Sequence, residues 1–151
     1  MSKAYEDDLI NRALAVLEKR AKYATFQLGS PSDVKNYLRL KMGEYGHEAF
    51  SCIWLDNQNR IIEMEEMFRG TLTQALFIPV RYEVTKSALA HNAAAVVFAH
   101  NHPSGLSEPS GAYHSLTETL KKTLALVDVR VLDHFIVTAE TCVSFAEKGW
   151  I

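Results

Sequence analysis

The chain is organised around an apolar run that ends in two histidines, Ala93-Ala94-Ala95-Val96-Val97-Phe98-Ala99-His100-Asn101-His102-Pro103-Ser104-Gly105. A uniformly apolar segment of this length, bounded by loop residues, predicts a strand that is buried on both faces of a sheet. Because alternate side chains of a strand point to the same side, we expect His100 and His102 to aim two imidazoles at one spot where the strand ends. Such a pair can offer a metal ion two ligands.

Two histidines do not complete a catalytic zinc site, which usually has three protein ligands and an open position for water. Ser110 follows the histidine loop and is a good N-cap for a helix. Residue 113 would then lie in the first helical turn, on the side that can face the histidines. That position holds a tyrosine.

This arrangement resembles the JAMM (JAB/MPN) metalloprotease motif, and residues 92–105 resemble the RadC-like branch of that superfamily in particular. Further segments at 68–72, 131–137 and 143–145 resemble RadC blocks in the same order. The resemblance covers about residues 45–150. It implies an α+β, JAB/MPN-like (cytidine-deaminase-like) fold, in which a mixed sheet is packed with helices. It also implies zinc-dependent hydrolysis of peptide or isopeptide bonds in a peptide or protein substrate.

The resemblance assigns roles to individual residues. His100 and His102 match the two histidine ligands of the zinc. Glu48 matches the glutamate that holds the metal-bound water and transfers its proton, and Ser110 matches the serine that donates to a developing oxyanion. Tyr113 stands where the family has its third zinc ligand, an aspartate.

The tyrosine at position 113 is expected to weaken zinc binding. A phenol with a pKa of about 10 must lose a proton to ligate well, whereas a carboxylate is already ionised at neutral pH. One lost ligand costs about 3 to 4 kcal/mol, or roughly two to three decades in affinity. The sequence therefore predicts a weak or absent zinc. It leaves open a RadC-like hydrolase or a non-catalytic protein-binding module of the same fold.

The composition of the chain limits the classes of protein to which it can belong. The chain has 151 residues, 48% hydrophobic and 23% charged, which is typical of one ordinary globular domain. A formal net charge of −2 gives no positive field for nucleic-acid phosphates, so the DNA-repair association of RadC relatives finds no support in charge. No apolar run is long enough for a membrane span, and the polar start lacks a signal-peptide layout, so we expect a cytoplasmic protein. Cys52 and Cys142 are expected to be buried, reduced thiols.

The rest of the chain alternates helical and strand patterns. Apolar spacing predicts helices over residues 5–21, 80–91 and 116–127, with another carrying Val34 to Leu40. Strands are predicted over residues 49–55 and 61–68, joined as a hairpin, and over 129–138 and 142–145. We divide the chain into an N-terminal helical segment, 1–44, and a RadC-like JAMM/MPN domain, 45–151.

The remaining histidines are expected to be structural or exposed to solvent. His47, His91 and His114 lie outside the motif, and His114 is turned about 100° round its helix from residue 113. Asp133 and His134 are neighbours on a predicted strand, so their side chains point to opposite faces and at most one of them can approach the histidine pair.

Overall fold

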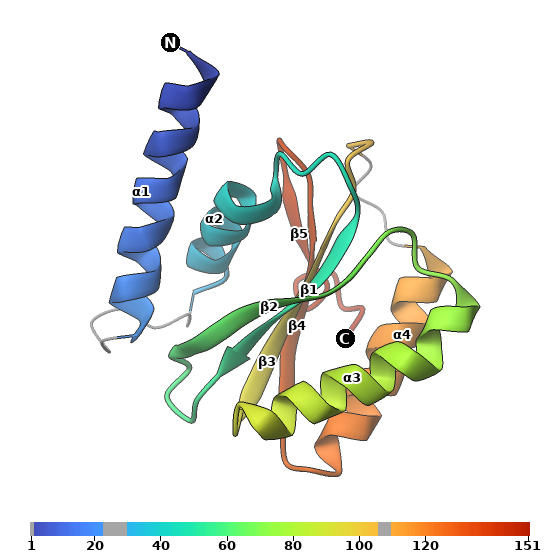
Figure 1. Cartoon of the computed structure of the whole chain (residues 1–151). Helices are drawn as coiled ribbons and strands as arrows, with labels where there is room; N and C mark the ends of the chain where they lie inside the picture. Colours follow the sequence, from blue (N-terminus) through green and yellow to red (C-terminus); the bar gives the residue numbers. More distant parts are fainter. Residues whose placement is uncertain (1, 23–29, 106–109) are drawn as a thin grey trace.

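The computed structural model describes residues 2–22, 30–105 and 110–151. These residues form four α-helices, one short 3-10 helix and five strands in a mixed arrangement (Figure 1). The helices are α1 (Lys3–Lys22), α2 (Pro31–Met42), α3 (Phe77–Ala90) and α4 (Gly111–Ala125), with η1 (Gln74–Leu76) directly before α3. The strands are β1 (Ala49–Leu55), β2 (Ile61–Arg69), β3 (Ala95–Asn101), β4 (Arg130–Val137) and β5 (Cys142–Ser144). The α+β class expected from the sequence is confirmed.

The strands form one sheet in the order β2-β1-β3-β4-β5. The β3 and β4 strands are parallel, while the other neighbouring pairs are antiparallel. The parallel pair needs a crossover, and α4 provides it. In this order β3 is the middle strand, and all seven of its residues, His100 among them, are buried. His102 follows the strand directly after Asn101.

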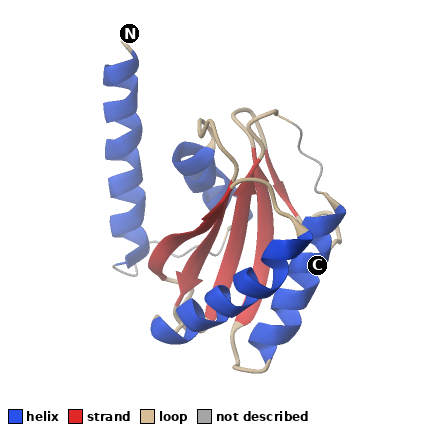
Figure 2. Ribbon diagram, turned by 45° about the vertical axis from the view of Figure 1, so that its right-hand side comes forward, coloured by secondary structure: helices blue, strands red, loops and turns tan. Residues whose placement is uncertain are grey.

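Helices cover both faces of the sheet (Figure 2). On one face, α1 and α2 pack on the odd-numbered side chains of β1 and β3, such as Ile53 and Val97. On the other face, α3 and α4 pack on the even-numbered side chains, such as Trp54 and Phe98. This alternation follows from the two-residue period of a strand. It assigns His100 and His102 to the face covered by α3 and α4.

Two helix starts show how local sequence sets the element bounds. Ser30 is the N-cap residue of α2, but its side chain makes no capping hydrogen bond, and Pro31 occupies the first turn. The third helix begins at Phe77, three residues earlier than expected, because Pro79 is tolerated in a first turn where its missing N–H costs nothing. Within the described part of the chain, no helix has both the length and the apolar character needed to cross a membrane.

Candidate functional site

The pairing of β1 with β3 places Glu48 near the two histidines. In the β1–β3 register Phe50 pairs with His100, and continuing this register by two residues puts Glu48 opposite His102. The Asn101 side chain fixes the backbone on both sides of Glu48: Oδ1 accepts from the Ala49 N–H at 2.7 Å, and Nδ2 donates to the His47 carbonyl at 2.7 Å. The half-buried Glu48 therefore lies at the same end of the sheet as the histidine pair.

Two further backbone bonds hold this end of the sheet. The Glu48 carbonyl accepts from the Gly70 N–H at 2.9 Å, and Gly70 has a φ of +97°, a conformation that other residues rarely adopt. The His102 N–H donates to the Val137 carbonyl at 2.9 Å. Glu48 and His102 are thus positioned by backbone contacts on either side of β3.

The two histidines converge, but not in an open pocket. Their ring centroids are 4.8 Å apart, as the strand alternation predicts. His100, however, has 0% exposed surface and does not open to solvent, although it lies near the end of its strand. The ring of Tyr113 covers one face of His100, on which it stacks with a centroid distance of 3.6 Å and an interplanar angle of 2°.

Tyr113 reaches this position because Ser110 starts α4 where the sequence predicted. The Ser110 hydroxyl accepts from the Tyr113 N–H at 3.3 Å and so caps the helix, which places residue 113 in the first turn. Burial, and after it the charge of Glu48, raise the pKa of the Tyr113 phenol, so it stays protonated. Its hydroxyl is buried and has no hydrogen-bond partner. Tyr113 therefore covers one face of the His100 ring and is a poor metal ligand.

A buried chain of hydrogen bonds runs from His100 to α4. His100 Nδ1 lies 2.7 Å from His134 Nε2, and His134 Nδ1 lies 2.6 Å from Thr117 Oγ1. Thr117 Oγ1 also donates to the Tyr113 carbonyl at 2.7 Å. Burial lowers the pKa of His100 well below its usual value and that of His134 to about 3, with smaller contributions from neighbouring histidines, so both rings are neutral.

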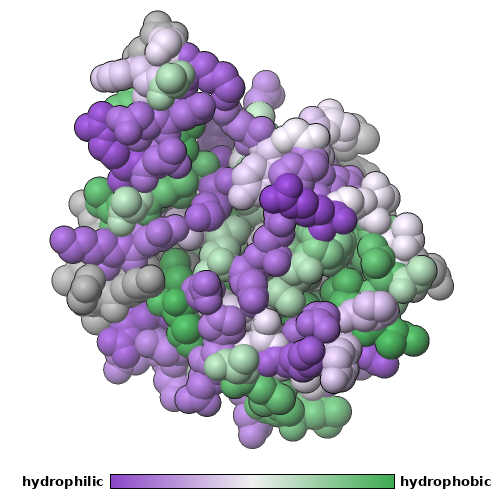
Figure 3. Space-filling view, viewed as in Figure 1, coloured by the Kyte–Doolittle hydropathy of each residue, from purple (hydrophilic) through white to green (hydrophobic). Residues whose placement is uncertain are grey.

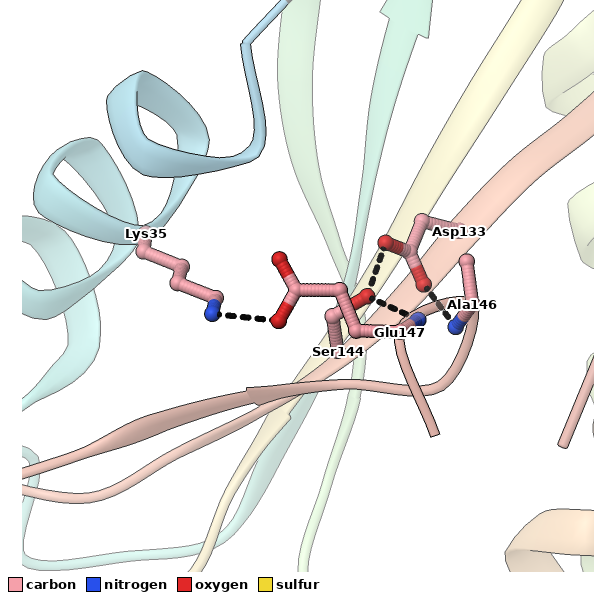
Figure 4. Close-up of polar contacts among 5 residues, drawn as sticks. All are labelled: Lys35, Asp133, Ser144, Ala146 and Glu147. Atoms are coloured by element: carbon pink, nitrogen blue, oxygen red, sulfur yellow. Dashed lines mark hydrogen bonds and ion pairs between the residues drawn. The ribbon is translucent and has the colours of Figure 1, made fainter. Parts of the chain in front are cut away.

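Asp133, which directly precedes His134 in β4, bonds to Ser144 and Ala146, as Figure 4 shows. Its carboxylate accepts from the Ser144 hydroxyl, from the Ala146 N–H at 3.0 Å and from the His134 N–H at 2.7 Å. The segment anchored in this way includes Phe145, whose ring stacks on His134 at 4.3 Å. As the strand alternation required, only His134 of this pair faces the histidine site, and Asp133 has a structural position.

The rings of the three remaining histidines contact other residues. His91 lies between the Ser87 carbonyl and Glu63, at 2.8 Å and 2.7 Å. His114 packs on Phe145 and Trp150. It does not replace the missing third ligand. His47 stacks on Tyr45.

The donor set does not fit a catalytic zinc with three protein ligands. Among the described residues, no three His, Cys, Asp or Glu side chains are grouped so that they could hold a metal ion. His100 offers one buried ring nitrogen without a partner, Nε2, and His102 lies beside it. The expected third position is filled by the protonated, stacked Tyr113. The roles of Glu48 and Ser110 in catalysis stay predictions.

The α+β sheet with two histidines at the end of its central strand defines a JAB-type domain. A family model described as RadC-like JAB domain matches residues 28–150, and the chain belongs to that family. It is 52% identical over 146 residues to a UPF0758 protein of Vibrio cholerae, covering 97% of this chain and 90% of that one. It is 58% identical over 121 residues to a UPF0758 protein of Dechloromonas aromatica, covering 80% of this chain and 53% of that one. The chain thus spans nearly all of the first relative and about half of the second.

Proposed function

We propose that this chain is a RadC-like JAB domain that has lost zinc-dependent peptide hydrolysis and acts as a protein-binding module. The stacking of Tyr113 on His100 carries this proposal, because it combines two effects at one position. It replaces an ionised carboxylate by a protonated phenol, and it covers the ring that would be the first ligand.

The other residues of the hydrolytic motif cannot compensate for this change. A bound zinc would supply a hydroxide by lowering the pKa of water from about 15.7 to about 7. By the family resemblance, the Glu48 carboxylate would accept a proton and the Ser110 hydroxyl would donate to an oxyanion. Neither residue generates hydroxide at neutral pH by itself, so the arrangement supports binding better than hydrolysis.

An exposed apolar stripe on α3 supports the binding half of the proposal. Ile78, Tyr82 and Leu89 are 70%, 63% and 58% exposed, and their spacing places them on one side of the helix. Apolar surface over this part of the molecule is visible in Figure 3. Large apolar side chains gathered on one face are typical of protein interaction sites.

The metal content of the protein tests the loss of hydrolysis. Protein purified without chelator should contain far less than one zinc per chain. Stoichiometric zinc in the wild-type protein, retained through gel filtration, would overturn the proposal.

A photo-crosslinking experiment tests the binding surface. A photoreactive phenylalanine analogue is placed at Leu89 and, as a matched control, at the exposed Lys121 of α4. In cells, crosslinks to one defined protein partner should form from position 89 and not from 121. Equal crosslinking from both positions, or none from position 89, would contradict a docking surface on α3.

A further inference from the structure

We propose that Thr117 and His134 are positioning residues that hold His100 in the Nδ1–H tautomer, so that its Nε2 carries a free lone pair. The proposal rests on two hydrogen bonds in series, which join Thr117 to His134 and His134 to His100 inside the core, and on a third from Thr117 to the Tyr113 carbonyl. All three residues are buried, so water cannot substitute for a missing partner. The assignment is independent of the proposed loss of hydrolysis.

The direction of the proton chain follows from counting donors. The Thr117 hydroxyl has one proton. When it donates to the Tyr113 carbonyl, its oxygen is free to accept from His134 Nδ1–H. His134 Nε2 is then an acceptor and receives the proton of His100 Nδ1. All three contacts are hydrogen bonds in this arrangement, and only a lone pair on His100 Nε2 is left without a partner.

The opposite direction is less stable. If Thr117 donates to His134, it no longer donates to the Tyr113 carbonyl, so one of the three hydrogen bonds is lost. His134 then donates to His100, whose Nε2 must carry a proton. That N–H would be buried without an acceptor, a situation that is rare in proteins.

With His100 in this tautomer, residue 113 is the position at which the site differs from a zinc centre. An imidazole ligates a metal only through an unprotonated nitrogen, and a hydrogen bond to the other nitrogen is the usual means of selecting it. This chain keeps such a hydrogen bond, because His134 Nε2 accepts from His100 Nδ1. His100 Nε2 thus stays unprotonated, as a metal ligand must be, although Tyr113 stacks on its ring.

Nitrogen NMR of the wild-type protein tests the tautomer directly. Long-range 1H–15N spectra of a sample labelled in histidine distinguish protonated from unprotonated ring nitrogens. His100 and His134 should each show a protonated Nδ1 and an unprotonated Nε2. A protonated Nε2 on both rings would overturn the proposal.

Substitutions at Thr117 test its positioning role. Thr117→Val keeps the shape and removes the hydroxyl, so the preference is lost and the Nε2–H form of His100 should appear. Thr117→Ser should restore the wild-type spectrum. Thr123→Val is the matched control, because Thr123 makes the same bond to a carbonyl one turn earlier on α4, at 2.8 Å, and is not part of the chain from Thr117 to His100. An unchanged His100 spectrum in Thr117→Val, or an equal change in Thr123→Val, would refute the role of Thr117.

Discussion

Replacing Asp133 with alanine is expected to destabilise the fold by several kcal/mol. The carboxylate accepts three hydrogen bonds, from Ser144, Ala146 and the His134 N–H. Ser144 and His134 are buried, whereas Ala146 is exposed and its N–H can turn to water. Each buried donor left without a partner costs about 1 to 3 kcal/mol. The expected loss in the free energy of unfolding is therefore about 2 to 6 kcal/mol.

Two matched variants separate this network from surface electrostatics. Asp133→Asn keeps the size and one acceptor oxygen but removes the charge, so a smaller loss of about 1 to 3 kcal/mol is expected. Glu147→Gln removes the half-exposed ion pair with Lys35, 2.8 Å long, and should cost about 0 to 1 kcal/mol.

Urea unfolding followed by circular dichroism measures all three variants, and equal slopes show that the surface exposed on unfolding is unchanged. The expected order of destabilisation is Asp133→Ala, then Asp133→Asn, then Glu147→Gln. If Asp133→Ala cost no more than Glu147→Gln, the carboxylate would not anchor the C-terminal segment on His134.

Two further predictions concern titratable groups. Burial lowers the pKa of His91, but hydrogen bonds to Glu63 and Ser87 raise it further, so the pKa lies above its usual value. Protonated His91 therefore stabilises the fold fully below the usual histidine pKa, and this stabilisation is lost as pH rises through the raised pKa. Urea unfolding from about pH 5.5 to about pH 8.5 should show this loss in the wild type and not in His91→Gln, and parallel pH profiles would contradict it. Burial raises the pKa of the Cys52 thiol, so a thiol reagent should label native Cys52 only at the rate of unfolding. Prompt labelling of Cys52 under native conditions would disprove its burial.

The sequence was sufficient for the parts of the site that depend on local periodicity. The two-residue period of a strand predicted that His100 and His102 converge, and the capping preference of serine predicted the start of α4 at Ser110. Both are confirmed. The family resemblance is confirmed as well, and the match from residue 28 includes α2. The division of the chain at residue 45 stays a prediction.

The contacts that decide the chemistry depend on register and packing, which the sequence does not specify. The link between His100 and His134 requires the parallel register of β3 and β4, in which Phe98 pairs with His134. The stacking of Tyr113 on His100 requires one rotamer of a side chain whose helical position alone allowed several. Thr117 was missed, although its place four residues after Tyr113 on the same helix face was a usable signal.

The affinity of Zn²⁺ for the wild type and for Tyr113→Asp, each titrated against a competing chelator, tests the central claim most directly. The substitution removes the ring that stacks on His100 and restores an ionised oxygen ligand in the first turn of α4, so affinity should rise by about two decades or more. Circular dichroism of both proteins checks that the fold is kept. Equal and tight binding by the two proteins would contradict the claim that Tyr113 disables the site, and equal failure to bind would contradict the claim that the defect is confined to residue 113.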